Sequence, residues 1–148
     1  MRSPAGITIR NDAHGEGRFG ASRKTRTHIG VDLDTLPKSY VYAPIDCTVK
    51  RIGTCYVGDP RFKLIELHGK CQIHRILYVN PNVIAGAHLS EGDVIGRSLD
   101  LRDKYGPAMV PHIHWEIIVM GIENRHIPAS SNYISSVYVN PLELLGVI

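Results

Sequence analysis

The segment PHIHWEI carries two imidazoles and a carboxylate at every second position. Side chains two residues apart lie on one face of a β-strand, so we expect His112, His114 and Glu116 to line up together. Ile113, which lies between the two histidines, would face the core. Imidazole and carboxylate groups bind Zn²⁺ and also transfer protons in acid–base catalysis. Such a pattern also occurs on strand faces that have no chemical task, so a metal site needs further ligands.

A second group of candidate ligands lies in the segment THIGVD, where His28 and Asp32 are four positions apart. Thr27, Gly30 and Val31 disfavour a helix, and in an extended strand the two side chains would lie about 13 Å apart. Each zinc ligand lies about 2 Å from the metal, so the backbone must bend between them. Gly30 permits that bend. The alternative is a loop with an incidental histidine and aspartate.

Together the two segments offer His28, Asp32 and His114 as three ligands for one Zn²⁺. Three protein ligands leave a fourth position for water, which is the arrangement of a catalytic rather than a structural zinc site. Asp34 is an alternative to Asp32 that would require a change of register.

Short apolar runs broken by Gly, Pro, Asn or Asp predict the elements that position these residues. Their spacing and β-branched content are typical of an antiparallel β-protein. The expected strands cover residues 29–33, 40–43, 46–52, 62–68, 72–79, 93–97 and 112–119.

Only the C-terminal segment is predicted to form a helix. Asn140 can cap it, Pro141 suits its first position, and Gly146 suits its end. The segment 103–111 is expected to be a long loop. The sequence therefore predicts a mainly β fold with one short C-terminal helix.

The 148 residues have the composition of a globular protein, with 43% hydrophobic residues and a formal net charge of +3. Their number fits a single domain over residues 1–148. The positive charge is small and scattered, which argues against a nucleic-acid partner and suits an anionic polymer such as a cell wall. No apolar run is long enough to span a membrane, and the first residues lack the apolar stretch of an export signal.

The three cysteines, Cys47, Cys55 and Cys71, are too few for a complete disulfide framework and lack the spacing of a zinc site. Their number favours free thiols in a protein made in a reducing compartment.

The order of several segments resembles the lysostaphin/LytM-type zinc metallopeptidases, which cut peptide bonds in bacterial peptidoglycan. The similarity covers about residues 15–145, nearly the whole chain. It implies a LytM-like barrel-sandwich hybrid, also called a duplicated hybrid motif, built of antiparallel sheets. The segments that carry it are HIGVD (28–32), VYAPIDCTV (41–49), YVN (78–80), EGDVIG (91–96), HIHWEI (112–117) and NPLELL (140–145). A narrower resemblance, to the chemotaxin-like members of the family, is carried by HGEGRFGASRKTRTHIGVD (14–32), YVNP (78–81) and KYGPAMVPHIHWE (104–116).

The resemblance also implies roles for individual residues. His28, Asp32 and His114 match the zinc ligands of the family. His112 matches a catalytic histidine that positions water or stabilises the transition state. Glu116, on the same strand face, is expected to orient an imidazole.

The family has a further catalytic histidine two positions after the tyrosine of YVN, and Asn80 occupies that position here. An asparagine cannot carry a proton, so the substitution affects catalysis rather than zinc binding. His14 and His126 lie in expected loops that could reach a groove. The remaining histidines, His68, His74 and His88, are interpreted as structural or surface residues.

These observations predict a zinc metallopeptidase that cleaves peptidoglycan peptide weakly. The alternatives are a zinc-containing module that binds cell wall without cutting it, as in the chemotaxin-like members of the family, and a structural part of a larger assembly. Because family members act outside the cytoplasm and no export signal is recognised, we expect a phage protein. It would be carried in the virion tail, with other tail proteins as partners, or released at lysis.

Overall fold

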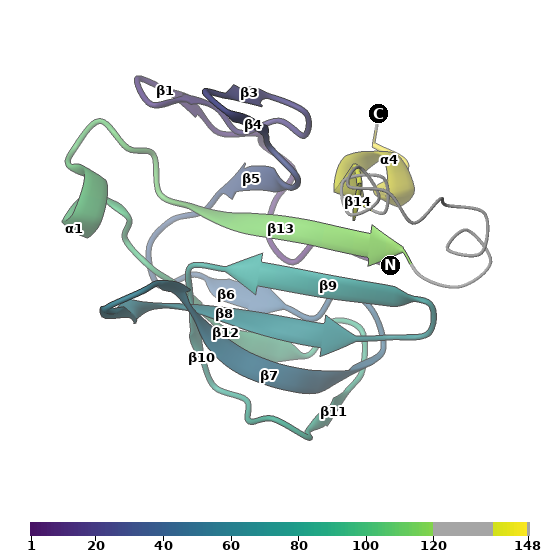
Figure 1. The fold of residues 1–148 in the computed structure, drawn as a ribbon. Coiled ribbons are helices and arrows are strands. Elements are labelled where there is room, and N and C mark those ends of the chain that lie inside the picture. Colours follow the sequence, from purple (N-terminus) through teal and green to yellow (C-terminus); the bar gives the residue numbers. More distant parts are fainter. Residues whose placement is uncertain (120–137, 148) are drawn as a thin grey trace.

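The computed structural model describes residues 1–119 and 138–147, which form an antiparallel β-structure with two short helices (Figure 1). Most of the strands belong to two sheets, and two small hairpins precede them. The strands are β1 (Asn11–Asp12), β2 (Gly15–Glu16), β3 (Ser22–Arg23), β4 (Arg26–Thr27), β5 (Val31–Asp34), β6 (Tyr40–Tyr42), β7 (Cys47–Tyr56), β8 (Asp59–His68), β9 (Gln72–Leu77), β10 (Val79–Pro81), β11 (His88–Leu89), β12 (Val94–Ser98), β13 (His112–Val119) and β14 (Tyr138–Val139).

The larger sheet has the order β11-β7-β8-β9-β13-β14, and β5 also pairs with β13. β13 runs through the middle of the molecule in Figure 1. On one side it pairs with β9. On the other side its first half pairs with β5, so that His114 lies opposite Asp32, and its second half pairs with β14. The antiparallel register of β5 and β13 thus joins two segments that are far apart in the chain.

The smaller sheet has the order β10-β12-β6 and lies behind β7 and β8 in Figure 1. Its inward side chains pack against those of the larger sheet and form the main core. Burial of these branched aliphatic side chains is the principal favourable term in the stability of such a fold. The core includes Val31, Leu33, Val41, Val49, Ile65, Leu67, Ile76, Val79, Ile95, Ile113, Trp115 and Ile117.

The expected strands are present, with differences at their ends. The strands expected at 46–52 and 62–68 extend toward one another as β7 and β8. The strand expected at 72–79 is interrupted at Tyr78, which has a φ of 72° and separates β9 from β10. A φ in this range is rare for a residue with a bulky side chain, so nothing in the local pattern indicated the break.

The prediction of helix only at the C-terminus is wrong in one place. Residues of the expected loop 103–111 contribute to a one-turn helix, α1 (Arg102–Tyr105). Asp100 accepts a hydrogen bond from the Arg102 backbone N–H, which starts the turn, and Gly106 ends it with a φ of 86°. This short capped turn lacks the apolar periodicity by which longer helices are recognised.

The C-terminal helix α4 (Pro141–Leu145) is confirmed together with its end signals. Asn140 Oδ1 accepts a hydrogen bond from the Leu142 N–H, and Gly146 closes the helix in the left-handed conformation. Within residues 1–119 and 138–147, no helix is both long and apolar enough to cross a membrane.

Candidate metal centre

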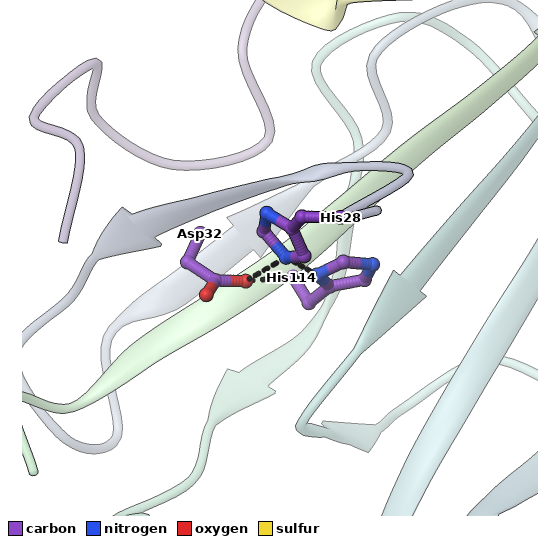
Figure 2. A group of neighbouring side chains, drawn as sticks. All are labelled: His28, Asp32 and His114. Carbon is purple, nitrogen blue, oxygen red and sulfur yellow. Dashed lines mark hydrogen bonds and ion pairs between the residues drawn. The ribbon is translucent and has the colours of Figure 1, made fainter. Parts of the chain in front are cut away.

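Three elements bring the predicted ligands together. His28 follows the β3–β4 hairpin, and its backbone N–H donates to Ala21 O. Asp32 lies on β5, and His114 lies opposite it on β13. Figure 2 shows the three side chains converging from these elements. The pairing of β5 with β13 therefore brings Asp32 and His114 close enough to bind the same metal ion.

Gly30 allows this approach for a different reason from the one expected. The chain does bend there, but Gly30 is not among the glycines with a positive φ. A Cβ atom at this position would lie 2.7 Å from His114 Nε2 and 2.6 Å from the carbonyl oxygen of Trp115. Any side chain would push β13 away, so the glycine is needed for close approach rather than for an unusual backbone angle.

The ligand atoms lie at distances that suit a tetrahedral metal. His28 Nε2 is 3.3 Å from Asp32 Oδ1 and 3.1 Å from His114 Nδ1, and the latter two atoms are 2.8 Å apart. Ligands about 2 Å from a tetrahedral Zn²⁺ are separated by about 3.3 Å. The three residues are the group in the described part of the chain whose donor atoms could hold one ion.

The other nitrogen of each imidazole has a protein acceptor. His28 Nδ1 lies 2.8 Å from the carbonyl oxygen of Arg18, and His114 Nε2 lies 3.0 Å from Glu116 Oε1. Because a carbonyl or carboxylate oxygen only accepts, these nitrogens carry the protons. His28 Nε2 and His114 Nδ1 both face Asp32 Oδ1, so these are the nitrogens that would bind a metal, as is usual for ligating histidines. The expected contact between Glu116 and an imidazole is present.

The second carboxylate oxygen of Asp32 is held by a buried arginine. Arg10 Nε and Nη2 donate to Asp32 Oδ2 at 3.2 and 3.1 Å, and Arg10 Nη1 donates to Asp12 Oδ1 at 2.7 Å. Burial by itself raises the pKa of Asp32, but hydrogen bonds from His114 and His28 outweigh it and hold the pKa well below its usual range. Oδ1 is therefore charged and faces the two histidines.

The two carboxylates beside His114 favour a second proton on this imidazole, at Nδ1. Burial lowers the pKa of this imidazole, but its hydrogen bonds to Asp32 and Glu116 dominate and raise the pKa to about 9. A metal that binds His114 Nδ1 must displace that proton, so binding releases it to solvent.

His112 lies beside the three ligands and is oriented independently of them. Its Nδ1 donates to the carbonyl oxygen of Val110 at 2.7 Å, which leaves Nε2 with a free lone pair. Nε2 is 3.9 Å from Asp32 Oδ2. Burial lowers the pKa of His112 despite the nearby carboxylate, so the ring is neutral near pH 7. A neutral, fixed imidazole with a free nitrogen can accept a proton.

These groups open into a cavity of about 540 Å³. One wall consists of the metal group with His112 and Glu116. Three tyrosines, one of them beside His112, form an aromatic wall, and Arg23 and the exposed Arg26 of the β3–β4 hairpin make the mouth basic. The full lining comprises Arg10, His14, Arg23, Arg26, Thr27, His28, Ile29, Asp32, Cys55, Tyr56, Leu77, Tyr78, Tyr105, Met109, His112, His114 and Glu116.

Asn80 is exposed on β10, opposite Arg97, and does not belong to the cavity lining in the described part of the chain. His14 lines the cavity, as its expected loop position allowed, whereas His126 lies outside the described residues. Asp34 is not part of the metal group.

The histidines interpreted as structural have partners away from the cavity. His74 is fully buried and accepts a hydrogen bond from Trp115 Nε1, His68 bonds to Glu66, and His88 bonds to Thr48.

Sequence reasoning missed Arg10 and the cavity tyrosines. Arg10 lies 22 positions before Asp32 in no recognisable motif. Tyr56 lies on β7, Tyr78 lies between β9 and β10, and Tyr105 lies on α1, so they are far apart in the sequence. The one available signal was the tyrosine of YVN.

Solved structures of lysostaphin-type peptidases share this fold. The chain superposes on the antimicrobial peptidase lysostaphin from Staphylococcus simulans with a TM-score of 0.65 and 19% identity, covering 94% of this chain and 50% of that one. For its catalytic domain alone the TM-score is 0.60 at 19% identity, with 88% and 87% covered. For LytU the TM-score is 0.55 at 21% identity, with 94% of both chains covered. The protein thus has the fold of lysostaphin-type peptidases, and it spans about half the length of whole lysostaphin.

A curated relative places the chain within this class. It is 32% identical over 108 residues to leukocyte cell-derived chemotaxin-2 of Mus musculus, which covers 71% of this chain and 69% of that protein. No protein-family model matches the sequence. The chain belongs to the lysostaphin/LytM-type family, and its similarity to the chemotaxin agrees with the narrower resemblance noted in the sequence.

Proposed function

We propose that this domain is a zinc metallopeptidase of the cell-wall hydrolase type, which cleaves peptide bonds of bacterial peptidoglycan. The observation that carries the proposal is the convergence of His28, Asp32 and His114 beside the free Nε2 of His112 in one open cavity. Three ligands next to an oriented base are the parts that metal-assisted hydrolysis requires.

Each residue of the site has a part in this chemistry. His28, Asp32 and His114 would hold the metal, which when bound polarises a carbonyl and acidifies a water molecule. His112 accepts the proton of the attacking water at Nε2 and returns it to the leaving amine. Glu116 orients His114, and Arg10 orients Asp32.

The basic mouth of the cavity supports an anionic polymer as substrate. The charge of Arg23 is partly balanced by Asp32, whose Oδ2 lies 4.0 Å from Arg23 Nη2. Among the described residues, Arg26 has no ion-pair or hydrogen-bond partner. Peptidoglycan carries carboxylates on its peptides, so two arginines at the entrance would attract it.

The position of Asn80 leads us to propose slow cleavage. Asn80, which stands where the resemblance implies a second catalytic histidine, is exposed and does not line the cavity. Loss of one general acid–base group typically costs about 10²–10⁴ in rate.

The test combines metal content with wall digestion. Purified protein should contain near-stoichiometric zinc and release soluble fragments from purified peptidoglycan. A chelator should stop the release, and added zinc should restore it. His112→Ala should retain zinc and lose cleavage, whereas His88→Ala, which changes an exposed histidine far from the cavity, should behave like the natural protein. Zinc-loaded protein that releases no fragments would reject the peptidase proposal.

The second candidate function is a zinc-containing module that grips cell-wall peptide without cutting it. The relationship to the chemotaxin and the asparagine at position 80 favour this alternative. Co-sedimentation with insoluble peptidoglycan in the absence of cleavage would support it. Absence of both binding and cleavage would favour a structural role in a larger assembly.

We further propose that the protein acts from a phage virion tail or after lysis. Cys47, Cys55 and Cys71 are all free thiols, which suits synthesis in a reducing compartment, while the proposed substrate lies outside the cell. Detection of the chain by mass spectrometry in purified virions or in phage lysates would support this. A gene located outside any phage genome, beside export components, would contradict it.

A further inference from the structure

The aromatic wall of the cavity begins at the unusual backbone of Tyr78. Its φ of 72° is costly for a bulky residue and persists only where the surroundings hold it. They do so here, because the Tyr78 N–H donates to Lys63 O at 2.9 Å and its carbonyl accepts from the Leu99 N–H at 3.2 Å. Val79 then enters the core, and Asn80 faces solvent. The kink therefore directs the tyrosine, and not the asparagine, into the cavity.

Tyr78 lies next to the proposed base. The rings of Tyr78 and His112 have centroids 5.5 Å apart and are nearly perpendicular, at 87°. Both residues line the cavity together with His114. A peptide bound in the cavity next to His112 would therefore also lie next to the side chain of Tyr78.

The hydroxyl of Tyr78 belongs to a cluster of three, which we call the tyrosine cluster: Tyr56, Tyr78 and Tyr105. Tyr56 Oη is 3.1 Å from Tyr78 Oη and is also hydrogen-bonded to Tyr105 Oη. Three hydroxyls supply three hydrogens, and two contacts within the cluster use only two of them. One hydrogen remains for donation outside the cluster, and all three residues line the cavity.

The cluster is held in place and kept neutral by apolar packing. The three rings pack against Phe62, Leu101 and other members of a small hydrophobic group. Burial raises the pKa of Tyr78 and that of Tyr56, so both hydroxyls keep their protons near neutral pH. A neutral hydroxyl fixed by packing can donate a hydrogen bond but cannot act as a base near pH 7.

We propose that Tyr78 is a catalytic residue that donates a hydrogen bond to the carbonyl oxygen of the bound peptide as negative charge develops on it. Tyr56 and Tyr105 position its hydroxyl. This inference rests on the proposed function, since it assigns a donor in the same cavity. It also places a hydrogen-bonding group beside His112 although Asn80 points away. Preorganised donors aimed at such an oxygen are a major source of rate enhancement in acyl-transfer enzymes.

The decisive measurement compares two ligands of the metal-loaded protein. One is a peptidoglycan stem peptide. The other is its phosphinic analogue, whose charged oxygen stands in for the oxyanion at the scissile bond. Dissociation constants are measured by calorimetry for the natural protein, Tyr78→Phe and Tyr40→Phe. Tyr40 is a matched control because its hydroxyl accepts from Arg97 on the smaller sheet, outside the cavity.

We expect the natural protein and Tyr40→Phe to prefer the analogue strongly. Tyr78→Phe should lose about 10²–10³ of that preference, which is the typical effect of removing one oxyanion donor, while still binding the ordinary peptide. Its kcat should fall by a similar factor with little change in KM. Equal weakening of both ligands would overturn the proposal, because it would make Tyr78 a packing residue. An unchanged preference in Tyr78→Phe, or no preference in the natural protein, would overturn it as well.

The same experiment separates this inference from the proposed function. If the natural protein prefers the analogue through Tyr78 but never cleaves the peptide, the hydrogen bond from Tyr78 to the bound oxygen is supported, while the peptidase proposal and a catalytic role for Tyr78 are rejected. If the natural protein cleaves the peptide, and Tyr78→Phe keeps both the cleavage rate and the preference for the analogue, the peptidase proposal is supported and the role of Tyr78 as a donor is rejected.

Discussion

Along β13, residues that alternate between the two faces are buried to nearly the same extent. Ile113, Trp115 and Ile117 have no exposed surface, and His114 and Glu116 are each 8% exposed. The first face packs among branched aliphatic side chains of the core, whereas the second is packed against other charged and polar groups. Burial alone therefore does not distinguish the face that stabilises the fold from the face that holds the site.

The two faces differ in the contacts that their buried side chains need. A buried apolar side chain needs only well-packed neighbours, but a buried polar group must have hydrogen-bond partners or it costs free energy. On the polar face, His112 donates to Val110 O, while His114 lies between Asp32 and Glu116. The side chains of the polar face are thus held in fixed orientations by hydrogen bonds, in addition to being buried. We expect changes on the apolar face to lower stability and changes on the polar face to lower metal affinity.

The largest effect should come from the apolar face. Trp115→Ala removes the largest side chain of the core and leaves a cavity, so the free energy of unfolding should fall by about 3–5 kcal/mol. Urea denaturation followed by circular dichroism measures this. Val57→Ala, in the fully exposed β7–β8 turn, is the control and should change stability little. A loss below about 1 kcal/mol for Trp115→Ala would mean that the core tolerates the void.

On the polar face, His114→Ala should reduce metal binding more than it reduces stability. Two remaining ligands bind zinc much more weakly than three, so the loss should exceed the about 10–100-fold that is typical when only a partner of a ligand is removed. Elemental analysis after dialysis, beside a denaturation curve, gives both quantities. Full zinc retention would mean that the ligands are wrongly assigned.

A smaller effect on metal affinity should follow from Arg10→Lys. The lysine keeps the positive charge but cannot make the paired contacts of Arg10 Nε and Nη2 with Asp32 Oδ2. We expect zinc affinity to fall by about 10–100-fold in competition with a chromogenic chelator. Arg97→Lys, which alters a contact with Tyr40, serves as the control and should retain the natural affinity. Equal affinity in both variants would show that Asp32 needs no external orientation.

The last expected effect is a gradual one, a pH dependence of stability on the apolar side of β13. His74 accepts a hydrogen bond from Trp115 Nε1 at its Nδ1, and burial lowers its pKa from 6.5 to about 4. Between these values the unfolded chain binds a proton that the folded chain does not, so stability falls as pH decreases from 6.5 to 4. The stabilising contribution of neutral His74 is complete above pH 6.5. Between pH 6.5 and 4 it changes the free energy of unfolding by at most about 1.4 kcal/mol per pH unit.

Urea midpoints at several pH values between 7 and 4 test this contribution. His74→Gln keeps a hydrogen-bond acceptor for Trp115 but does not titrate, so its stability should depend less on pH over this range. The same slope in both proteins would assign the dependence to other groups.

Local patterns in the sequence sufficed for the elements and for part of the site. Alternation in HIHWEI predicted which residues of β13 share a face, because that depends only on the two-residue period of a strand. The cap signals at Asn140 and Gly146 predicted α4, because they act within one helical turn. The proposed ligands could be found because they lie in two short segments that resemble a known family. In each case the deciding interaction or signal lies within a few residues.

Tertiary structure decided the features that depend on distant residues. Asp32 and His114 are 82 positions apart, and the pairing of β5 with β13 sets the distance between their ligand atoms. Arg10 reaches Asp32 because its segment pairs with β5, where the Arg10 N–H donates to Asp32 O and Ile9 bridges to Leu33. The contacts of Tyr78 with Lys63 and Leu99 decide that Tyr78 faces the cavity and Asn80 faces solvent. A φ of 72° at a tyrosine is unfavourable locally, so only the surrounding strands can maintain it, and no pattern within the segment YVN could have indicated it.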